Sequence, residues 1–245
     1  MQDGSERLTR LLETARRDPG AVWVVVAVVP AEPVEGSVGE QLQAWVREQV
    51  AVWPAPVAIG CNRPHVEDGS ATFASPERYH CAFGADGSTV LALPVGGLRD
   101  GAAAGEPVWA IGEGAVAWIT VAALHLAGAF AARTGVRGSA LAGLTVRASG
   151  ESGFQVFNRD AHGLTPVGRR LDAVRPVVRS VSVAECAGAG VAGVARPLVV
   201  DLLGCFGLHD SRHIDAAGML RRQNFTGHDE RILTWSTAIG LPSVW

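Results

Sequence analysis

The 245-residue chain contains no lysine, and all 21 of its basic side chains are arginine. This absence excludes phosphate-binding loops of the GxxxxGK[ST] type, the strand lysine of protein kinases, pyridoxal Schiff bases and lysine general bases, because each needs an ammonium group. With a single tyrosine, Tyr79, and no lysine, the Tyr-Lys chemistry of short-chain reductases is excluded too. The excess of arginine, alanine, glycine and valine is typical of a GC-rich bacterial genome.

Several other signals are missing. The sequence has no G-x-S-x-G elbow and no H-E-x-x-H pair, so it lacks these hydrolase and metalloprotease signatures. Its first residues show no basic region followed by an apolar run, so we expect no secretory signal and a cytoplasmic protein. The four cysteines form no CxxC pair and are expected to be free, mostly buried thiols: Cys61, Cys81, Cys186 and Cys205.

The composition that is present indicates a folded core, with 48% hydrophobic and 18% charged residues. The net charge of −3 conceals an asymmetry. Residues 1–132 hold 8 arginines against 15 acids, whereas residues 133–245 hold 13 arginines against 9 acids. This split favours a partner with an acidic face, or self-association, although solvated surface charge would give the same counts.

The first half of the chain predicts helices and strands in alternation. Residues 22–29 form a continuous apolar run with six valines, which predicts a strand buried on both faces. Residues 94–107 are rich in glycine and alanine and are interpreted as a flexible connection. The remaining predicted elements are a helix over 5–17, a helix opened by the capping pattern of Ser37 and Glu40 and ended by Pro54, and a hairpin of 79–83 with 89–93.

The second half opens with a long apolar helix over about 114–133, whose 115–132 stretch carries no formal charge. We expect this helix to be buried in the core rather than in a membrane. The elements predicted after it are a hairpin of 141–148 with 154–158, a strand over 177–183, a helix over 191–206, a hairpin around 216–218, and a last helix opened by Thr226.

This pattern predicts an α+β fold with a mixed, largely antiparallel sheet flanked by helices, organised as one domain or as two similar subdomains. The predicted division is an N-terminal α/β subdomain over 1–95, a Gly/Ala-rich connection over 96–112 and a C-terminal α+β subdomain over 113–245. From residue 113 the element order α-β-β-β-α-β-β-α resembles that of type III secretion chaperones and YbjN-like proteins. The resemblance implies a protein-binding adaptor or chaperone.

Two glycine-rich or histidine-rich segments are the clearest local motifs. Gly188 to Gly193 matches GxGxxG between a predicted strand and a predicted helix, but four residues separate the strand from the first glycine, and no further βαβ unit follows. We therefore predict no cofactor.

The candidate metal ligands are His209, Asp210, His213 and His228. A strand at 211–215 would hold residues 209 and 213 roughly 13 Å apart, too far for one ion. We predict no metal and keep a metal-dependent hydrolase as an alternative.

A third cluster runs from Cys61 to Asp68 and includes His65, so that a Cys-His nucleophilic pair is conceivable. The His-x-Glu of this segment lacks the downstream cysteines of zinc deaminases. Catalytic pairs usually meet through the fold rather than along the chain. No catalytic residue is therefore assigned from the sequence.

The arginines of the second half are the residues expected to bind a partner. Their guanidinium groups donate paired hydrogen bonds to carboxylate or phosphate. The predicted set comprises Arg169, Arg170, Arg175, Arg179, Arg221 and Arg222. We predict a non-enzymatic protein-interaction module, such as an adaptor, chaperone or regulatory subunit, with a nucleic-acid-binding accessory protein as the alternative.

Overall fold

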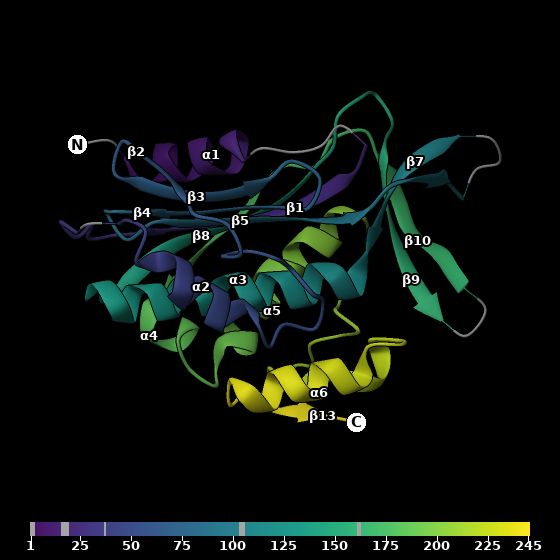
Figure 1. Cartoon of the computed structure of the whole chain (residues 1–245). Helices are drawn as coiled ribbons and strands as arrows, with labels where there is room; N and C mark the ends of the chain where they lie inside the picture. Colours follow the sequence, from purple (N-terminus) through teal and green to yellow (C-terminus); the bar gives the residue numbers. More distant parts are fainter. Residues whose placement is uncertain (1–2, 16–19, 37, 103–105, 161–162) are drawn as a thin grey trace.

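The computed structural model describes residues 3–15, 20–36, 38–102, 106–160 and 163–245 (Figure 1). Its centre is a seven-stranded sheet in which every neighbouring pair is antiparallel, in the order β11-β8-β1-β5-β4-β3-β2. The strands are β1 (Val22–Pro30), β2 (His65–Glu67), β3 (Ser70–Ser75), β4 (Tyr79–Gly84), β5 (Thr89–Gly96), β8 (Ser139–Arg147) and β11 (Val177–Ser182).

A second, four-stranded sheet projects from one end of the first (Figure 1). Its order is β10 (Gly163–Leu171), β9 (Phe154–Asp160), β7 (Pro107–Gly112) and β6 (Leu98–Asp100), and only β7 and β9 run parallel. The predicted α+β class, with a mixed and largely antiparallel arrangement flanked by helices, is confirmed. β1 from the predicted N-terminal subdomain pairs with β8 from the predicted C-terminal one.

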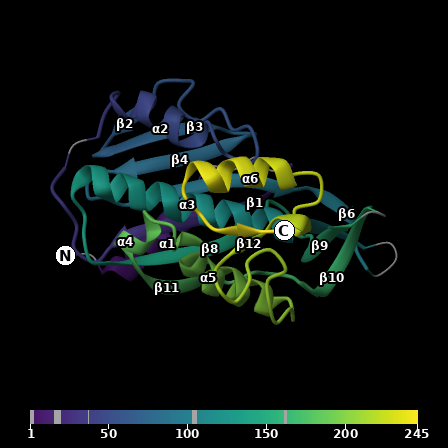
Figure 2. The ribbon, with the colours of Figure 1, turned by 90° about the horizontal axis from the view of Figure 1, so that it is seen from below.

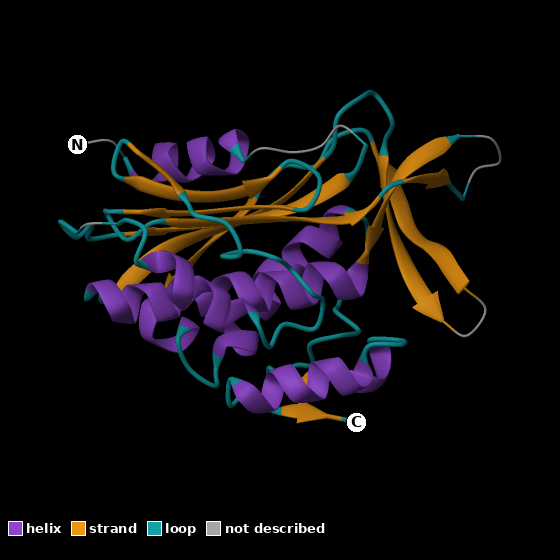
Figure 3. Cartoon of the chain, in the orientation of Figure 1, coloured by secondary structure: helices purple, strands orange, loops and turns teal. Residues whose placement is uncertain are grey.

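The helices lie on both faces of the large sheet (Figure 3). On one face lies α1 (Gly4–Thr14); on the other lie α2 (Leu42–Val50), α3 (Glu113–Thr134), α4 (Val183–Cys186) and α5 (Val191–Cys205). A last group lies beyond α3, on the side away from the sheet (Figure 1): β12 (Leu220–Arg221), η1 (Arg222–Asn224), α6 (Asp229–Ala238) and β13 (Ser243–Val244), with β12 and β13 paired in parallel.

The predicted strand at 22–29 is confirmed as β1, and all nine of its residues are buried. Successive side chains of a strand point to opposite faces. Accordingly Val24 and Val26 pack in the cluster that contains α3, whereas Trp23 and Val25 pack against α1. A continuous apolar run without alternation is what a strand covered on both faces requires.

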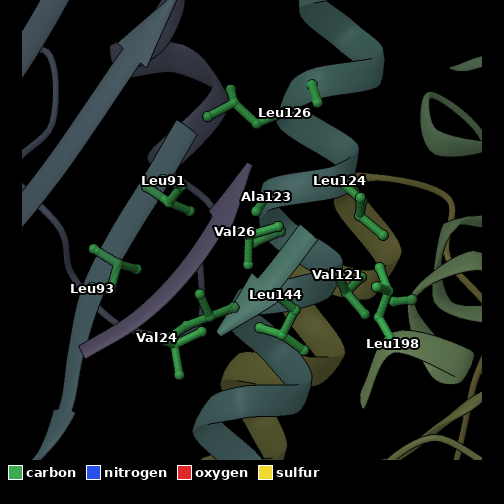
Figure 4. Close-up of a cluster of buried hydrophobic side chains, with 14 of the residues drawn as sticks. Val24, Val26, Leu91, Leu93, Val121, Ala123, Leu124, Leu126, Leu144 and Leu198 are labelled. Atoms are coloured by element: carbon green, nitrogen blue, oxygen red, sulfur yellow. The ribbon is translucent and has the colours of Figure 1, made fainter. Parts of the chain in front are cut away.

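The long helix α3 is the central element of the core, as predicted. It is long and apolar enough to cross a membrane by length and composition, yet 72% of its most apolar window is buried inside the protein. Apolar residues surround the helix because β1, β5, α4 and α5 all contact it. Figure 4 shows members of the resulting cluster, including Val121 and Leu124 of α3 and Leu198 of α5. The protein itself therefore covers most of the apolar surface of this helix.

The hairpin predicted for 141–148 with 154–158 is wrong. Both strands exist, but β8 pairs with β1 and β11 in the large sheet, whereas β9 pairs with β7 and β10 in the small one. β10 and the short α4 were not predicted. From residue 113 the chain therefore has four strands before the next helix, instead of three.

The segment predicted as a flexible connection contributes strands instead. Residues 98–100 form β6 and residues 107–112 form β7, while residues 103–105 lie outside the described part. Its glycines allow the two sheets to approach each other: a Cβ on Gly96 would lie 2.0 Å from the carbonyl oxygen of Ala110. At Gly96, the glycine reflects backbone contact between the two sheets.

Two predicted helix starts are also wrong. The second helix begins at Leu42 after a turn, and its N-cap, Gln41, makes no side-chain capping bond; Ser37 lies outside the described residues. The last helix begins at Asp229, with His228 rather than Thr226 at the N-cap position. The side chain of Thr226 instead donates to the carbonyl oxygen of Arg159 on β9.

Two helical glycines give opposite expectations for the same substitution. A Cβ on Gly128 of α3 would lie 2.3 Å from the backbone nitrogen of Ala187, whereas Gly204 of α5 has open space. Alanine is favoured over glycine in a helix by up to about 1 kcal/mol, but forcing a backbone apart in a packed core costs about 1–3 kcal/mol. We expect Gly128→Ala to lower and Gly204→Ala to raise the free energy of unfolding, measured in urea. Equal effects of both substitutions would contradict this packing.

Candidate functional site

A cavity of about 300 Å³ lies where the large sheet, the small sheet and the C-terminal segment meet. Figure 2 shows α6 alongside α3, with β9 and β10 beyond the end of α3. We call this space the inner cavity. Residues from six parts of the chain line it: Pro54, Ala55, Val95, Gly112, Glu113, Gly114, Ala115, Trp118, Phe157, Asn158, Arg159, Leu164, Arg212, His213, Asn224, Phe225, Thr226, His228 and Ile232.

The start of α3 places a carboxylate beside this cavity. β7 runs into α3 without a loop, since Gly112 ends the strand and is also the N-cap of the helix. Glu113 is therefore the first helical residue, and only 2% of it is exposed. A buried carboxylate needs charged or hydrogen-bonded partners, because water no longer solvates it.

Those partners come from a segment that lies a hundred positions further along the sequence. One oxygen of Glu113, Oε1, accepts from the backbone N–H of Arg212 at 2.7 Å and lies 3.1 Å from Nδ1 of His213. The other ring nitrogen of His213, Nε2, lies 3.0 Å from the carbonyl oxygen of Asn224. The ring also packs edge-on against Phe225, with centroids 4.6 Å apart.

This pattern assigns protons to both ring nitrogens of His213. An ionised carboxylate and a backbone carbonyl can only accept hydrogen bonds. Each ring nitrogen therefore lies against an acceptor, Nδ1 against Glu113 and Nε2 against the carbonyl oxygen of Asn224, an arrangement that favours protons on both nitrogens. The pair is a buried ion pair with its hydrogen bonds completed by backbone groups.

The pKa of Glu113 follows from this environment. Burial by itself raises the pKa of the carboxyl group, because the charged form loses its hydration. The hydrogen bond and positive charge of His213, together with the N–H and the charge of Arg212, outweigh that effect, so the pKa lies below its ordinary value. Glu113 is consequently ionised at neutral pH.

The pair resembles a catalytic carboxylate-histidine dyad, but its geometry leaves no base free. Nε2, the nitrogen that would accept a proton from a nucleophile, is already bonded to Asn224. The nearby hydroxyls are occupied: Ser211 accepts from the backbone N–H of His213 and of Ile214, and Thr226 donates to β9. The arrangement anchors the C-terminal segment to α3 and does not assemble a nucleophile with a base.

A second hollow of about 660 Å³ adjoins the inner cavity, and Ala55 and Trp118 line both. We call it the outer hollow. It lies between the end of α2, the loop that follows it, β5 and α3. Its other lining residues are Val50, Ala51, Pro56, Val57, Ala58, Glu77, Arg78, Leu93 and Pro94. Most of these side chains are apolar, and several are exposed.

The candidate metal ligands do not come together. His213 is buried against Glu113, Asp210 pairs with Arg196 at 2.6 Å, and His209 and His228 are exposed. Within the described ranges, no group of three or more His, Cys, Asp or Glu side chains could hold a metal ion. The strand considered for 211–215 is not formed; Ile214 makes a single bridge to Leu220.

The predicted partner-binding arginines are distributed over several elements, and some are held within the chain. Arg179 pairs with Asp201 of α5 at 2.6 Å, and Arg170 pairs with Glu106. Nε of Arg169 donates to the carbonyl oxygen of Cys205, at the end of the same helix α5. The guanidinium of Arg222 lies 5.3 Å from the centre of the Trp245 ring.

Two arginines of that set are free of such contacts. Arg175 and Arg221 are exposed, and neither side chain reaches a carboxylate among the residues that the structure describes. They lie on different elements, before β11 and in β12. The arginines that line the inner cavity, Arg159 and Arg212, were not in the predicted set.

The remaining motifs acquire structural roles. The GxGxxG segment does not follow directly on a strand, because α4 separates β11 from it, and Gly190 is the N-cap of α5. Cys61 is exposed, and the ring of His65 pairs with Glu67 at 3.1 Å rather than with the thiol. All four cysteines are free, as predicted, and burial raises the pKa of Cys186 to about 12, so that its thiol is inert at neutral pH.

The sequence offered little to identify Glu113. An acidic residue in the first turn of a helix is a common partner of the helix dipole, so its presence there does not indicate a buried ion pair. The sequence indicates His213 only as a possible metal ligand.

Comparison of the chain with protein-family models, curated proteins and solved structures finds no significant match.

Proposed function

We propose that this protein is a non-enzymatic interaction module, an adaptor, chaperone or regulatory subunit, that binds an apolar segment of a partner protein in the outer hollow. The observation that carries the proposal is the hollow itself, which lies between α2, β5 and α3, has a volume of about 660 Å³ and has mostly apolar walls. Exposed apolar surface of this kind is typical of interaction sites.

The shape of the hollow favours a protein over a small ligand. Small-molecule sites bury most of their ligand's surface. Here Ala51, Pro56 and Pro94 are all exposed in the walls, so a small molecule would stay largely in water. A partner chain would supply its own cover. At the interface, Trp118 offers a large apolar side chain of the kind that dominates binding energy.

Two further observations support an interaction role. The Glu113–His213 pair has no ring nitrogen free for proton transfer, so it does not provide a base. The exposed Arg175 and Arg221 remain available to an acidic partner surface, as the charge split of the sequence suggested. With four free cysteines, we place this activity in the cytoplasm.

The proposal is tested by affinity purification of the full chain from its native host, followed by mass spectrometry. The blocking variant is Ala51→Arg, which adds a charged side chain to the exposed wall of the hollow. The matched control is Ala184→Arg, an exposed alanine in α4, away from the hollow. We expect the blocking variant to lose its partner by about tenfold or more, and the control to retain it.

Three results would contradict the proposal. One is recovery of the same proteins at the same yield with Ala51→Arg. Another is a lone chain with nothing bound at low salt. The third is recovery of RNA or DNA whose binding falls steeply as salt rises, which would favour the nucleic-acid alternative.

A further inference from the structure

We infer that the inner cavity is a binding site for a small apolar carboxylate, a compound with an aromatic or aliphatic body and one carboxylate group. This site adjoins the outer hollow and shares Ala55 and Trp118 with it, but it takes a different ligand from the partner protein proposed there. It rests on the size, walls and charge of the inner cavity.

The size fits a small molecule. About 300 Å³ corresponds to the volume of on the order of ten water molecules in the liquid. The cavity is also at the lower end of the range of small-molecule sites, about 300–1,000 Å³. It is bordered by several buried side chains, including Phe157, Phe225 and Ile232.

The walls are suited to an apolar body. Val95, Trp118 and Leu164 complete the apolar lining, and they come from β5, α3 and β10. Leu164 is 41% exposed although it is a large apolar residue. An apolar ligand in the cavity would cover part of this side chain, which the protein alone leaves in water.

The charges of the cavity favour an anion. Arg159 and Arg212 both line it and are exposed, and in the described part of the chain neither guanidinium reaches a carboxylate. The acidic group of the lining, Glu113, is already neutralised by His213. The charge of Arg212 also acts on Glu113, but in the described part of the chain no side-chain hydrogen bond occupies either guanidinium group, so both can donate paired hydrogen bonds to a carboxylate.

Two further features of the lining concern its hydrogen-bonding groups. The first turn of α3 lies at the cavity, and its N-cap, Gly112, has no side chain to cap the helix, so this helix terminus favours an anion. The side-chain oxygen of Asn158 is buried with no hydrogen-bond partner among the described residues; it is an acceptor, so it requires a donor such as water and does not itself bind a carboxylate. Such a group finds its partner in solvent or in a ligand.

The experiment compares two probes of the same shape, 4-phenylbutanoate and its neutral amide 4-phenylbutanamide, by isothermal titration calorimetry on the full chain near neutral pH and at low salt. We expect the wild-type protein to bind the acid about tenfold more tightly than the amide, because only the acid forms charge-assisted bonds. In Arg159→Ala/Arg212→Ala this preference should disappear. The matched control is Arg175→Ala, an exposed arginine elsewhere, which should keep it.

A second variant separates the cavity from nonspecific charge. Ala115→Leu fills the cavity from the first turn of α3 with a residue that favours helix, and should abolish binding of both probes. The variant of the outer hollow, Ala51→Arg, should bind the acid like the wild type, so failure of the partner proposal and of this one are distinguishable.

Equal binding of acid and amide would overturn the inference. So would a preference for the acid that survives in Arg159→Ala/Arg212→Ala, or unchanged binding in Ala115→Leu. The absence of any heat of binding for either probe up to about 10 mM would overturn it as well, because a site built for this chemistry should exceed that affinity.

Discussion

Replacing His213 with alanine is expected to lower the free energy of unfolding by about 3–5 kcal/mol, the cost of leaving one partner of a buried ion pair alone. The substitution removes the cation beside Glu113, the donor to the carbonyl oxygen of Asn224, and the ring that packs on Phe225. Only the backbone N–H of Arg212 would then remain on the buried carboxylate. Urea unfolding followed by circular dichroism measures the loss.

His209→Ala is the matched control, because this histidine lies four residues away but is exposed. We expect a change of within about 0.5 kcal/mol for it. The double variant Glu113→Gln/His213→Ala should cost less than the sum of the single variants, since the two residues share one interaction. Equal stability of His213→Ala and His209→Ala would refute the assignment of the pair as an anchor.

The same pair predicts how stability depends on pH. The pKa of Glu113 is lowered from its ordinary value of 4.5 in the folded protein. Between the folded and the unfolded pKa the unfolded chain binds more protons, so stability falls as pH falls. The contribution of Glu113 is therefore fully present above about pH 4.5 and is lost as the pH drops through the folded pKa. Glu113→Gln should flatten the acid limb of the stability profile, and an unchanged limb would contradict the shift.

Truncating Phe130 of α3 to alanine is the second large effect expected, with a loss of about 3–5 kcal/mol. The ring is 1% exposed, and its centroid lies 4.9 Å from that of Phe83 on β4 and 6.1 Å from that of Trp45 on α2. Removing it leaves a cavity between a helix pair and the large sheet, where neither side can close easily. The free energy of unfolding in urea is again the measurement.

Leu98→Ala provides the comparison, because Leu98 of β6 is a large apolar residue that is 54% exposed. It should change stability by no more than about 0.5 kcal/mol. If Phe130→Ala were as mild as Leu98→Ala, α3 would not be the central core helix that the structure describes.

Much of the fold could be predicted where local pattern reports burial. The valine run of β1 requires cover on both faces of the strand, and the apolar residues around α3 require cover on all sides of the helix. Both elements are central to the core. The hairpin of β4 and β5 was predicted because its two strands and turn are adjacent in the chain. The predicted β8–β9 hairpin is wrong because β8 pairs with the distant β1 and with β11, whereas β9 pairs with the distant β7 and with β10, which was not predicted.

The candidate sites were harder to predict. The arginines that the sequence singled out lie on several elements, and Arg170 and Arg179 are paired with acids of their own protein. The arginines of the inner cavity, Arg159 and Arg212, are 53 positions apart, and no local pattern links them.

By itself, the sequence determined the class of the fold, its buried strand and helix, and the chemistry that a chain without lysine cannot perform, because composition and periodicity carry those properties locally. The tertiary structure alone decided which strands pair, that Glu113 and His213 meet across a hundred residues, and that two hollows share Trp118. The physical reason is that pairing and cavity formation depend on contacts between distant segments, which gain their energy only when the whole core is assembled.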